Sequence, residues 1–155
     1  MAAELVILTG MGVISSLGTS ISETRVAFRQ PARVPVPSPF SANGLRLPVF
    51  LVSDFEVTGL SRTLGLALHA ASEALSDAGV ARFAEPERVG VCIGTTVASQ
   101  INDIPFYEAL RKTGQVDTEA VARYRRGNVA EAVARKIGAR GPHLTVSNAC
   151  SSGAD

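Results

Sequence analysis

The feature that most constrains the fold is a set of short, continuous apolar runs separated by segments of helical periodicity. The runs cover residues 5–8, 88–94 and 144–147. Glycine lies at or near the end of the first two, and Gly141-Pro142 precedes the third. Runs of this length are typical of strands covered on both faces, which belong to α/β sheets. Strands that alternate with helices predict right-handed crossovers. We therefore expect an α/β fold with a mainly parallel sheet packed by helices.

The helical segments are predicted from periodicity and capping residues. Residues 61–78 place Leu64, Leu68 and Leu75 on one face, and Gly79 follows as a C-cap. Shorter or less regular helices are predicted over 20–28, where Ser20 caps and Glu23 follows, over 102–112, and over 118–137, with a break at 127–128 and an end at Gly138. Five prolines in 30–54 predict a surface excursion, with a short strand at 49–52.

Composition excludes several classes of function. The chain has 155 residues, a net charge of +1, 5% aromatic residues and no tryptophan, so nothing predicts nucleic-acid binding. The two cysteines allow neither a disulfide framework nor a zinc site, which favours a reducing, cytoplasmic setting without metal or cofactor. No apolar run reaches the roughly 18 residues of a membrane span, and residues 1–18 lack a basic start. We expect a soluble protein.

Gly10 and Gly12 follow the first apolar run, which suggests a nucleotide-binding site. Ser15 stands where the third glycine of the dinucleotide fingerprint would lie, and no strand ending in an acidic residue follows about 20 residues later. The pattern therefore disfavours this site.

The segment most informative about chemistry is TVSNACSSGAD, residues 145–155. An apolar strand leads into a turn of small residues, with Cys150 at its tip and a helix expected to begin there. A helix start stabilises thiolate, and the turn's N–H groups can stabilise an oxyanion. The pattern predicts a nucleophile at Cys150. The alternative is a small buried thiol without a reaction, the common state of a free cysteine.

This segment resembles the active-site signature of the β-ketoacyl-acyl carrier protein synthases, which have the thiolase-like fold. VILTGMGVISSLG (6–18), ALHAASEALSDAGV (67–80), RVGVCIGTT (88–96) and the run from Gly127 to Gly153 resemble further blocks of the family in family order. The resemblance covers nearly the whole chain. It implies that residues 1–155 are an N-terminal β-ketoacyl synthase domain, the first half of the fold, cut five residues after the nucleophile.

The resemblance also implies the reaction. Cys150 would accept an acyl group and then yield it to a carbanion made by decarboxylation of a malonyl thioester. The family's two catalytic histidines and its lysine follow the nucleophile, beyond Asp155. Residues 1–155 alone are therefore expected to be inactive and to aggregate or need a partner.

Partners follow from the same resemblance. An acyl carrier protein would supply both thioesters. Family members often place several basic residues just before the helix at 61–78, where the carrier docks, and this chain departs from that pattern because it offers only Arg62 there. A homodimer or synthase-like heterodimer is expected, in a fatty acid or polyketide-type pathway. The alternative is a non-catalytic partner subunit of the chain-length-factor type, although such subunits replace the nucleophile.

Other candidates receive structural interpretations. Cys92 is predicted to be a core thiol, and Asn128 to make a structural hydrogen bond. His69 and His143 match no catalytic position of the family and are assigned no role.

Overall fold

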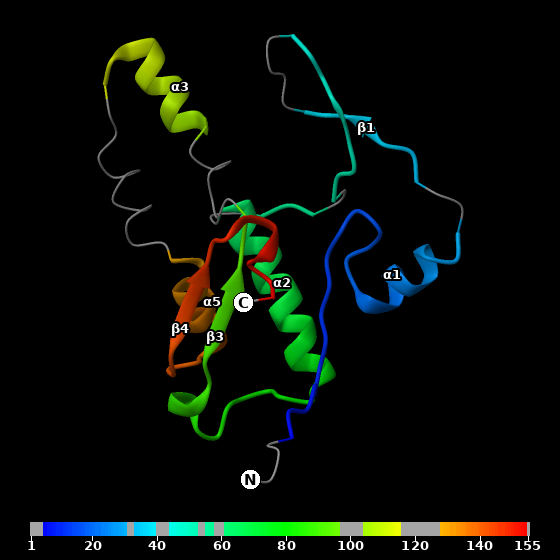
Figure 1. The fold of residues 1–155 in the computed structure, drawn as a ribbon, viewed down its shortest axis with the longest axis vertical. Helices are drawn as coiled ribbons and strands as arrows, with labels where there is room; N and C mark the ends of the chain where they lie inside the picture. Colours follow the sequence, from blue (N-terminus) through cyan, green and yellow to red (C-terminus); the bar gives the residue numbers. More distant parts are fainter. Residues whose placement is uncertain are drawn as a thin grey trace. The chain divides into compact units, whose positions relative to one another are not determined.

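The computed structural model describes residues 5–30, 33–39, 44–52, 55–57, 61–96, 104–115 and 128–154 (Figure 1). Its contacts group the chain into two compact units, one of Met1–Glu56 with His69–Val80 and the other of Val57–Leu68 with Ala81–Asp155. The elements are α1 (Ile21–Ala27), β1 (Val36–Pro37), β2 (Pro48–Val49), α2 (Arg62–Asp77), η1 (Pro86–Arg88), β3 (Val91–Gly94), α3 (Ile104–Thr113), α5 (Val129–Ile137), β4 (His143–Val146) and η3 (Ala149–Ser151). Each unit is described by itself.

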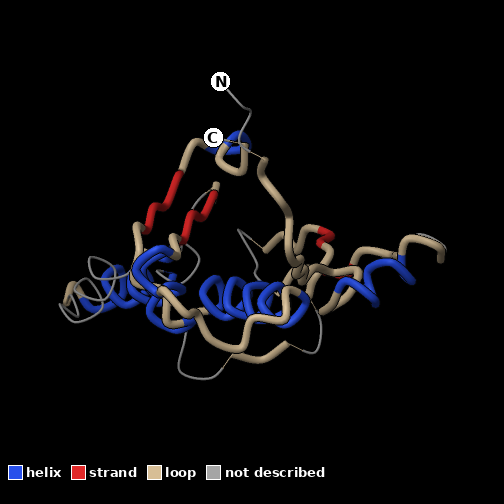
Figure 2. Tube along the Cα trace, turned by 90° about the horizontal axis from the view of Figure 1, so that it is seen from below, coloured by secondary structure: helices blue, strands red, loops and turns tan. Residues whose placement is uncertain are grey.

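The second unit is built on a parallel pair of strands. β3 and β4 pair in parallel with Ile93 opposite Thr145, and α5 packs against both. Figure 1 shows the two strands side by side, and Figure 2 shows both ending toward the C-terminus of the chain. The predicted α/β arrangement with parallel strands is confirmed. The apolar residues buried in the described part of the chain are Val129, Ala130, Val133, Ala134 and Ala139.

Only one face of this strand pair is covered by α5. The Thr145 hydroxyl lies 3.2 Å from the Ala130 amide nitrogen at the start of α5, so Thr145 and its neighbour Ile93 face the helix. Side chains alternate along a strand, so Cys92 and its partner Leu144 point to the opposite face. Cys92 is exposed and Leu144 is 59% exposed. The prediction that Cys92 is a core thiol is therefore wrong, because its face of β3 is uncovered.

Asn128 makes the predicted structural hydrogen bond. It is the N-cap of α5, and its side-chain oxygen accepts the Ala130 N–H at 3.0 Å. The same oxygen accepts a hydrogen bond from the Thr145 hydroxyl, which ties the cap to β4. One side chain thus satisfies the helix start and joins the helix to the strand that leads to Cys150.

We expect Asn128→Ala to lower the free energy of unfolding by about 1–2 kcal/mol, because the cap is lost and the Thr145 hydroxyl loses its acceptor. Asn128→Asp, which keeps the cap oxygen, is the matched control and should retain most of the stability. Thermal melting of soluble protein measures both variants. Equal melting temperatures for Asn128→Ala and the unmodified protein would contradict the role of the cap.

The first unit contains α1, which begins as predicted. The Ser20 hydroxyl accepts the Glu23 N–H at 3.2 Å and caps the helix. The Glu23 carboxylate accepts the Thr19 N–H at 2.7 Å and the Thr19 hydroxyl at 3.0 Å. The bond from the Thr19 N–H, and to a smaller extent the bond from the Thr19 hydroxyl, lowers the pKa of Glu23 below its ordinary value because both bonds favour the charged carboxylate.

The glycine turn after residue 8 packs closely on α2. A Cβ at Gly10 would lie 2.3 Å from the Ala74 carbonyl oxygen, and a Cβ at Gly12 would lie 2.0 Å from that of Ala70. Carboxylates of α2 hold the same segment, since Asp77 accepts the Met11 N–H at 2.9 Å. Close packing on a helix therefore accounts for both glycines that had suggested a nucleotide site.

The predicted buried strand at residues 5–8 is not found. These residues belong to no strand, and their side chains are between 68% and 93% exposed. Gly10 already lies against Ala78, just beyond the last residue of α2. Residues 5–8 therefore run past the end of the helix, where α2 cannot cover them. An apolar run becomes a buried strand only where neighbouring strands and covering helices meet it.

The remaining predictions are met in part. Helix α2 covers most of 61–78, and Gly79 follows it with a positive φ of 68°. Helix α3 covers most of the helix predicted at 102–112, and α5 covers the end of 118–137, closed by Gly138. Within the proline-rich excursion, β2 pairs antiparallel with β1, so the short strand lies at 48–49. Residues 118–127 of that helix lie outside the described residues, and so does the predicted break at 127–128 except for Asn128.

No helix in the described part of the chain is both long enough and apolar enough to cross a bilayer.

Candidate functional site

Cys150 lies in a tight turn directly after β4. Ser147 and Asn148 lead out of the strand, and the helical turn η3 covers Ala149–Ser151. The turn is closed by bonds from the Ser151 and Ser152 amides to the carbonyl oxygens of Asn148 and Ala149, each 3.3 Å. Cys150 is exposed to solvent. The structure thus places the thiol on the tip of a turn, open to a reactant, and not in the apolar packing that an inert thiol usually occupies.

The backbone of this turn is unusual at the residue before the cysteine. Ala149 has a φ of +52°, the only positive φ of a non-glycine residue in the described part of the chain. A left-handed conformation costs an alanine about 1–2 kcal/mol and persists only where surrounding contacts impose it. Such strain clusters at functional sites, so the turn is held in this shape against its local preference.

The end of β3 packs directly against the turn. A Cβ on Gly94 would lie 2.2 Å from the Ser152 carbonyl oxygen and 2.8 Å from the Gly153 amide nitrogen. Both are backbone atoms, so no side-chain rotation could relieve the contact. The Thr95 N–H also donates to the Val146 carbonyl oxygen at 2.9 Å, which extends the strand pairing to the turn. Only glycine fits at position 94 beneath the turn that carries Cys150.

Ser152 links the turn to β3. Its Oγ lies 3.0 Å from the Thr95 carbonyl oxygen, 2.8 Å from the Ala149 carbonyl oxygen and 2.6 Å from the Asn148 amide nitrogen. Sequence reasoning described Ser152 only as a small residue and gave Gly94 no role. The signal available for Gly94 was its position at the carboxyl end of an apolar run, but its contact with Ser152 joins residues far apart in sequence.

The predicted helix at Cys150 is only partly found. η3 is a single turn of three residues, and a further turn over 152–154 follows it within the described residues. Within the described residues, no long helix begins at Cys150 whose dipole would stabilise a thiolate there. The turn's own N–H groups remain the local donors that could stabilise an oxyanion.

The two histidines have other places in the fold. His143 is the first residue of β4, and Cys150 follows the other end of that strand. The His69 Nε2–H donates to the Thr19 carbonyl oxygen at 2.5 Å, a structural contact within the first unit. Within the described ranges, no group of three histidine, cysteine or acidic residues is arranged to hold a metal.

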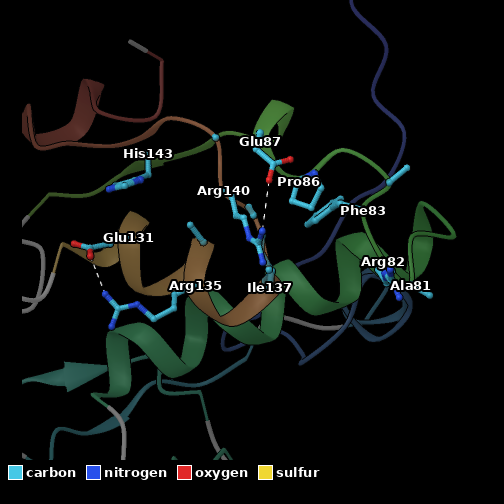
Figure 3. A pocket seen from close by; sticks show the side chains of 15 residues that line it. Ala81, Arg82, Phe83, Pro86, Glu87, Glu131, Arg135, Ile137, Arg140 and His143 are labelled. Atoms are coloured by element: carbon cyan, nitrogen blue, oxygen red, sulfur yellow. Dashed lines mark hydrogen bonds and ion pairs between the residues drawn. The ribbon is translucent and has the colours of Figure 1, made fainter.

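A hollow of the second unit is lined by residues other than Cys150 (Figure 3). Its volume is about 740 Å³, and it is lined by the segment around Phe83, the end of α5 and His143. Two exposed ion pairs lie in it, Arg140 with Glu87 at 3.5 Å and Arg135 with Glu131 at 2.7 Å. Because His143 begins β4 and the nucleophile turn follows its end, this hollow is not the pocket of the thiol.

Comparison with known proteins agrees with this geometry. Residues 7–155 match the family model "Beta-ketoacyl synthase, N-terminal domain". The chain is 32% identical to the "Oxytetracycline polyketide putative beta-ketoacyl synthase 1" of Streptomyces rimosus, over 99% of this chain and 40% of that protein. It is 29% identical to the "Putative polyketide beta-ketoacyl synthase 1" of Streptomyces cyaneus, again over 40% of that protein. The chain thus spans about 40% of the length of these curated relatives.

Solved structures show the same fold. The ishigamide ketosynthase/chain length factor matches 91% of this chain and 39% of its own with a TM-score of 0.74 and 28% identity. A β-ketoacyl synthase from Burkholderia phymatum matches 96% of this chain and 40% of its own with a TM-score of 0.75 at 19% identity, a likeness of fold alone. The expected thiolase-like α/β fold is confirmed. Because the family model matches nearly the whole of this chain, the chain belongs to the β-ketoacyl synthase family, as an N-terminal domain.

Proposed function

We propose that residues 1–155 form the nucleophile-bearing N-terminal domain of a β-ketoacyl synthase that acts in polyketide-type or fatty acid biosynthesis. The observation that carries this proposal is the exposed thiol of Cys150 on a strained turn at the end of a parallel strand. The turn lies within the part of the chain that matches the family model. The two curated relatives are named as polyketide synthases, which favours that class of pathway.

The first step transfers an acyl group to Cys150. Its thiolate attacks the carbonyl carbon of an acyl thioester, and the carrier's thiolate leaves when the tetrahedral intermediate collapses. The amide N–H groups of the turn, that of Cys150 among them, are the donors proposed for the oxyanion of this intermediate. The exposure of the turn allows a bulky thioester to approach.

The second step forms the carbon–carbon bond. A malonyl thioester loses CO₂, and the resulting carbanion attacks the acyl carbon on Cys150. The cysteine thiolate leaves, and the product is a 3-oxoacyl thioester on the carrier. The family resemblance assigns assistance in the decarboxylation to two histidines and a lysine that follow the nucleophile. Condensation therefore requires more than residues 1–155.

The proposed partner is an acyl carrier protein, which would bring both thioesters. Arg62 is exposed at the start of α2, where a basic residue can meet an acidic carrier. Arg135 is another basic candidate; it lies on a solvated helix face and pairs with Glu131 at 2.7 Å. The synthase is proposed to work as a homodimer or as a synthase-like heterodimer.

A non-catalytic partner subunit is the second candidate. It is favoured by the 28% identity to the ishigamide ketosynthase/chain length factor, whose name includes such a subunit. The presence of Cys150 weighs against it, because chain-length factors replace the nucleophile in the family. The two candidates differ in one measurable property, the acylation of Cys150.

Acylation is tested by mass spectrometry after incubation with an acyl-carrier protein, in protein supplied with the remainder of a synthase. The chain has two cysteines, so an adduct can be assigned to one of two peptides. We expect one acyl group on the Cys150 peptide and a loss of at least about 10³-fold in acylation rate for Cys150→Ala. Cerulenin, an inhibitor of the family that alkylates the nucleophile, should modify the same peptide.

Cys92→Ala is the matched control, because Cys92 is also exposed yet lies on β3 and not in the turn. This variant should be acylated at the rate of the unmodified protein. Acylation on Cys92, or an unchanged rate in Cys150→Ala, would contradict the proposed nucleophile. A folded complex whose Cys150 stays unacylated and inert to cerulenin would favour the partner subunit.

A further inference from the structure

Ser152 is the one buried residue of the exposed segment from Ser147 to Ala154. Its exposure is 6%, whereas the other residues of that segment, Cys150 included, are exposed. Burying a hydroxyl without hydrogen bonds costs free energy, so a buried serine in an exposed turn needs compensating partners. The structure supplies three of them.

Two of the three partners belong to the strained residue and the residue before it. Ser152 Oγ accepts the Asn148 N–H at 2.6 Å and lies 2.8 Å from the Ala149 carbonyl oxygen, so it binds the backbone of both residues. Its single proton is shared between that carbonyl oxygen and the carbonyl oxygen of Thr95 at 3.0 Å. These bonds favour the left-handed conformation of Ala149 and attach it to the end of β3.

We propose that Ser152 is a positioning residue, whose buried hydroxyl holds the strained turn in the shape that presents the Cys150 thiol and its neighbouring N–H groups to a thioester. The inference rests on the proposed function of Cys150, and it adds that acylation requires the hydrogen-bonded Ser152 hydroxyl. Ser152 Oγ touches three backbone atoms and no reacting atom, so its effect passes through the geometry of Asn148 and Ala149. Displacement of a reacting group by about 1 Å costs about 100-fold in rate.

The neighbouring serine provides a control within the same turn. Ser151 Oγ donates to the Asn148 carbonyl oxygen at 2.9 Å, but Ser151 is exposed and its bond stays within the turn. Water can replace such a bond when the hydroxyl is removed. Ser151→Ala should therefore leave the rate of acylation within about threefold of the unmodified protein.

The test compares two reactions of the same sulfur in the condensing enzyme. Acylation by an acyl-carrier protein requires the aligned N–H groups of the turn, whereas alkylation by iodoacetamide requires only an accessible thiolate. For Ser152→Ala we expect acylation of Cys150 to slow about 10- to 100-fold, while its alkylation changes by less than about threefold. Alkylation of Cys92, an exposed thiol outside the turn, is the internal standard in the same sample, and it should not change.

Two variants of equal size isolate the hydroxyl if Ser152→Ala does not fold. Ser152→Thr keeps the oxygen and Ser152→Val removes it at nearly the same volume. We expect acylation to be faster in the threonine variant by about 10-fold or more.

The outcomes distinguish a failure of the positioning role of Ser152 from a failure of the proposed acylation of Cys150. Equal acylation rates in Ser152→Ala and the unmodified protein, or in the threonine and valine variants, would overturn the positioning role alone. Acylation and alkylation of Cys150 that fall together by the same factor would show a merely structural serine and overturn the positioning role as well. Absence of acylation in the unmodified enzyme would remove the proposed function, and with it the role of Ser152.

Discussion

Gly94→Ala is expected to abolish acyl transfer to Cys150 and to destabilise the second unit. The added Cβ would lie 2.2 Å from the Ser152 carbonyl oxygen and 2.5 Å from the Ser152 carbonyl carbon. Because these are backbone atoms, either β3 or the nucleophile turn must move. Overpacking of this kind typically costs about 1–3 kcal/mol. A displaced turn loses its alignment with a thioester, so we expect acylation to fall by about 100-fold or more.

The matched control is Gly153→Ala, in the same turn. A Cβ at Gly153 would have no atom within 4 Å, and its φ is not positive, so its melting temperature should stay within about 2 °C of the unmodified protein. Thermal melting and mass spectrometry of the acyl adduct measure the two effects. An acylation rate for Gly94→Ala equal to that of the unmodified protein would show that β3 does not support the turn.

Residues 1–155 produced alone are expected to self-associate and to form no 3-oxoacyl product. Leu5, Val6, Ile7 and Leu8 are largely exposed, as are Leu144 and Cys92 on the uncovered face of the strand pair. Burying each large apolar side chain is worth about 1.5–3 kcal/mol, which is large beside a typical domain stability of about 5–15 kcal/mol. Contiguous exposed apolar residues of this kind drive association.

Size-exclusion chromatography with light scattering measures the association. Val6→Thr with Leu8→Thr, which reduces the apolar character of the run, should raise the monomer fraction if residues 5–8 are responsible. Coexpression with the remainder of a synthase should give soluble protein with condensing activity. A stable monomer of residues 1–155 that turns over malonyl-carrier protein would refute the expectation.

The amino-acid sequence by itself determined the features whose causes lie within a few residues. Ser20 caps α1 through the amide three residues ahead, and Gly79 and Gly138 adopt positive φ after α2 and α5. The strand before Cys150 and the turn that carries it were also predicted, from an apolar run followed by small residues. Each of these outcomes depends on local sterics and hydrogen bonds that the residues carry with them.

Tertiary structure decided whatever depends on a neighbour distant in sequence. The apolar residues 5–8 were predicted to be buried, yet α2 ends before it can cover them. Cys92 was predicted to lie in the core, but α5 covers only the other face of β3. The Ser152 hydroxyl meets the Thr95 carbonyl oxygen across 57 positions of sequence. Hydrophobicity is a property of a residue, whereas burial and support require a second surface that only the folded chain provides.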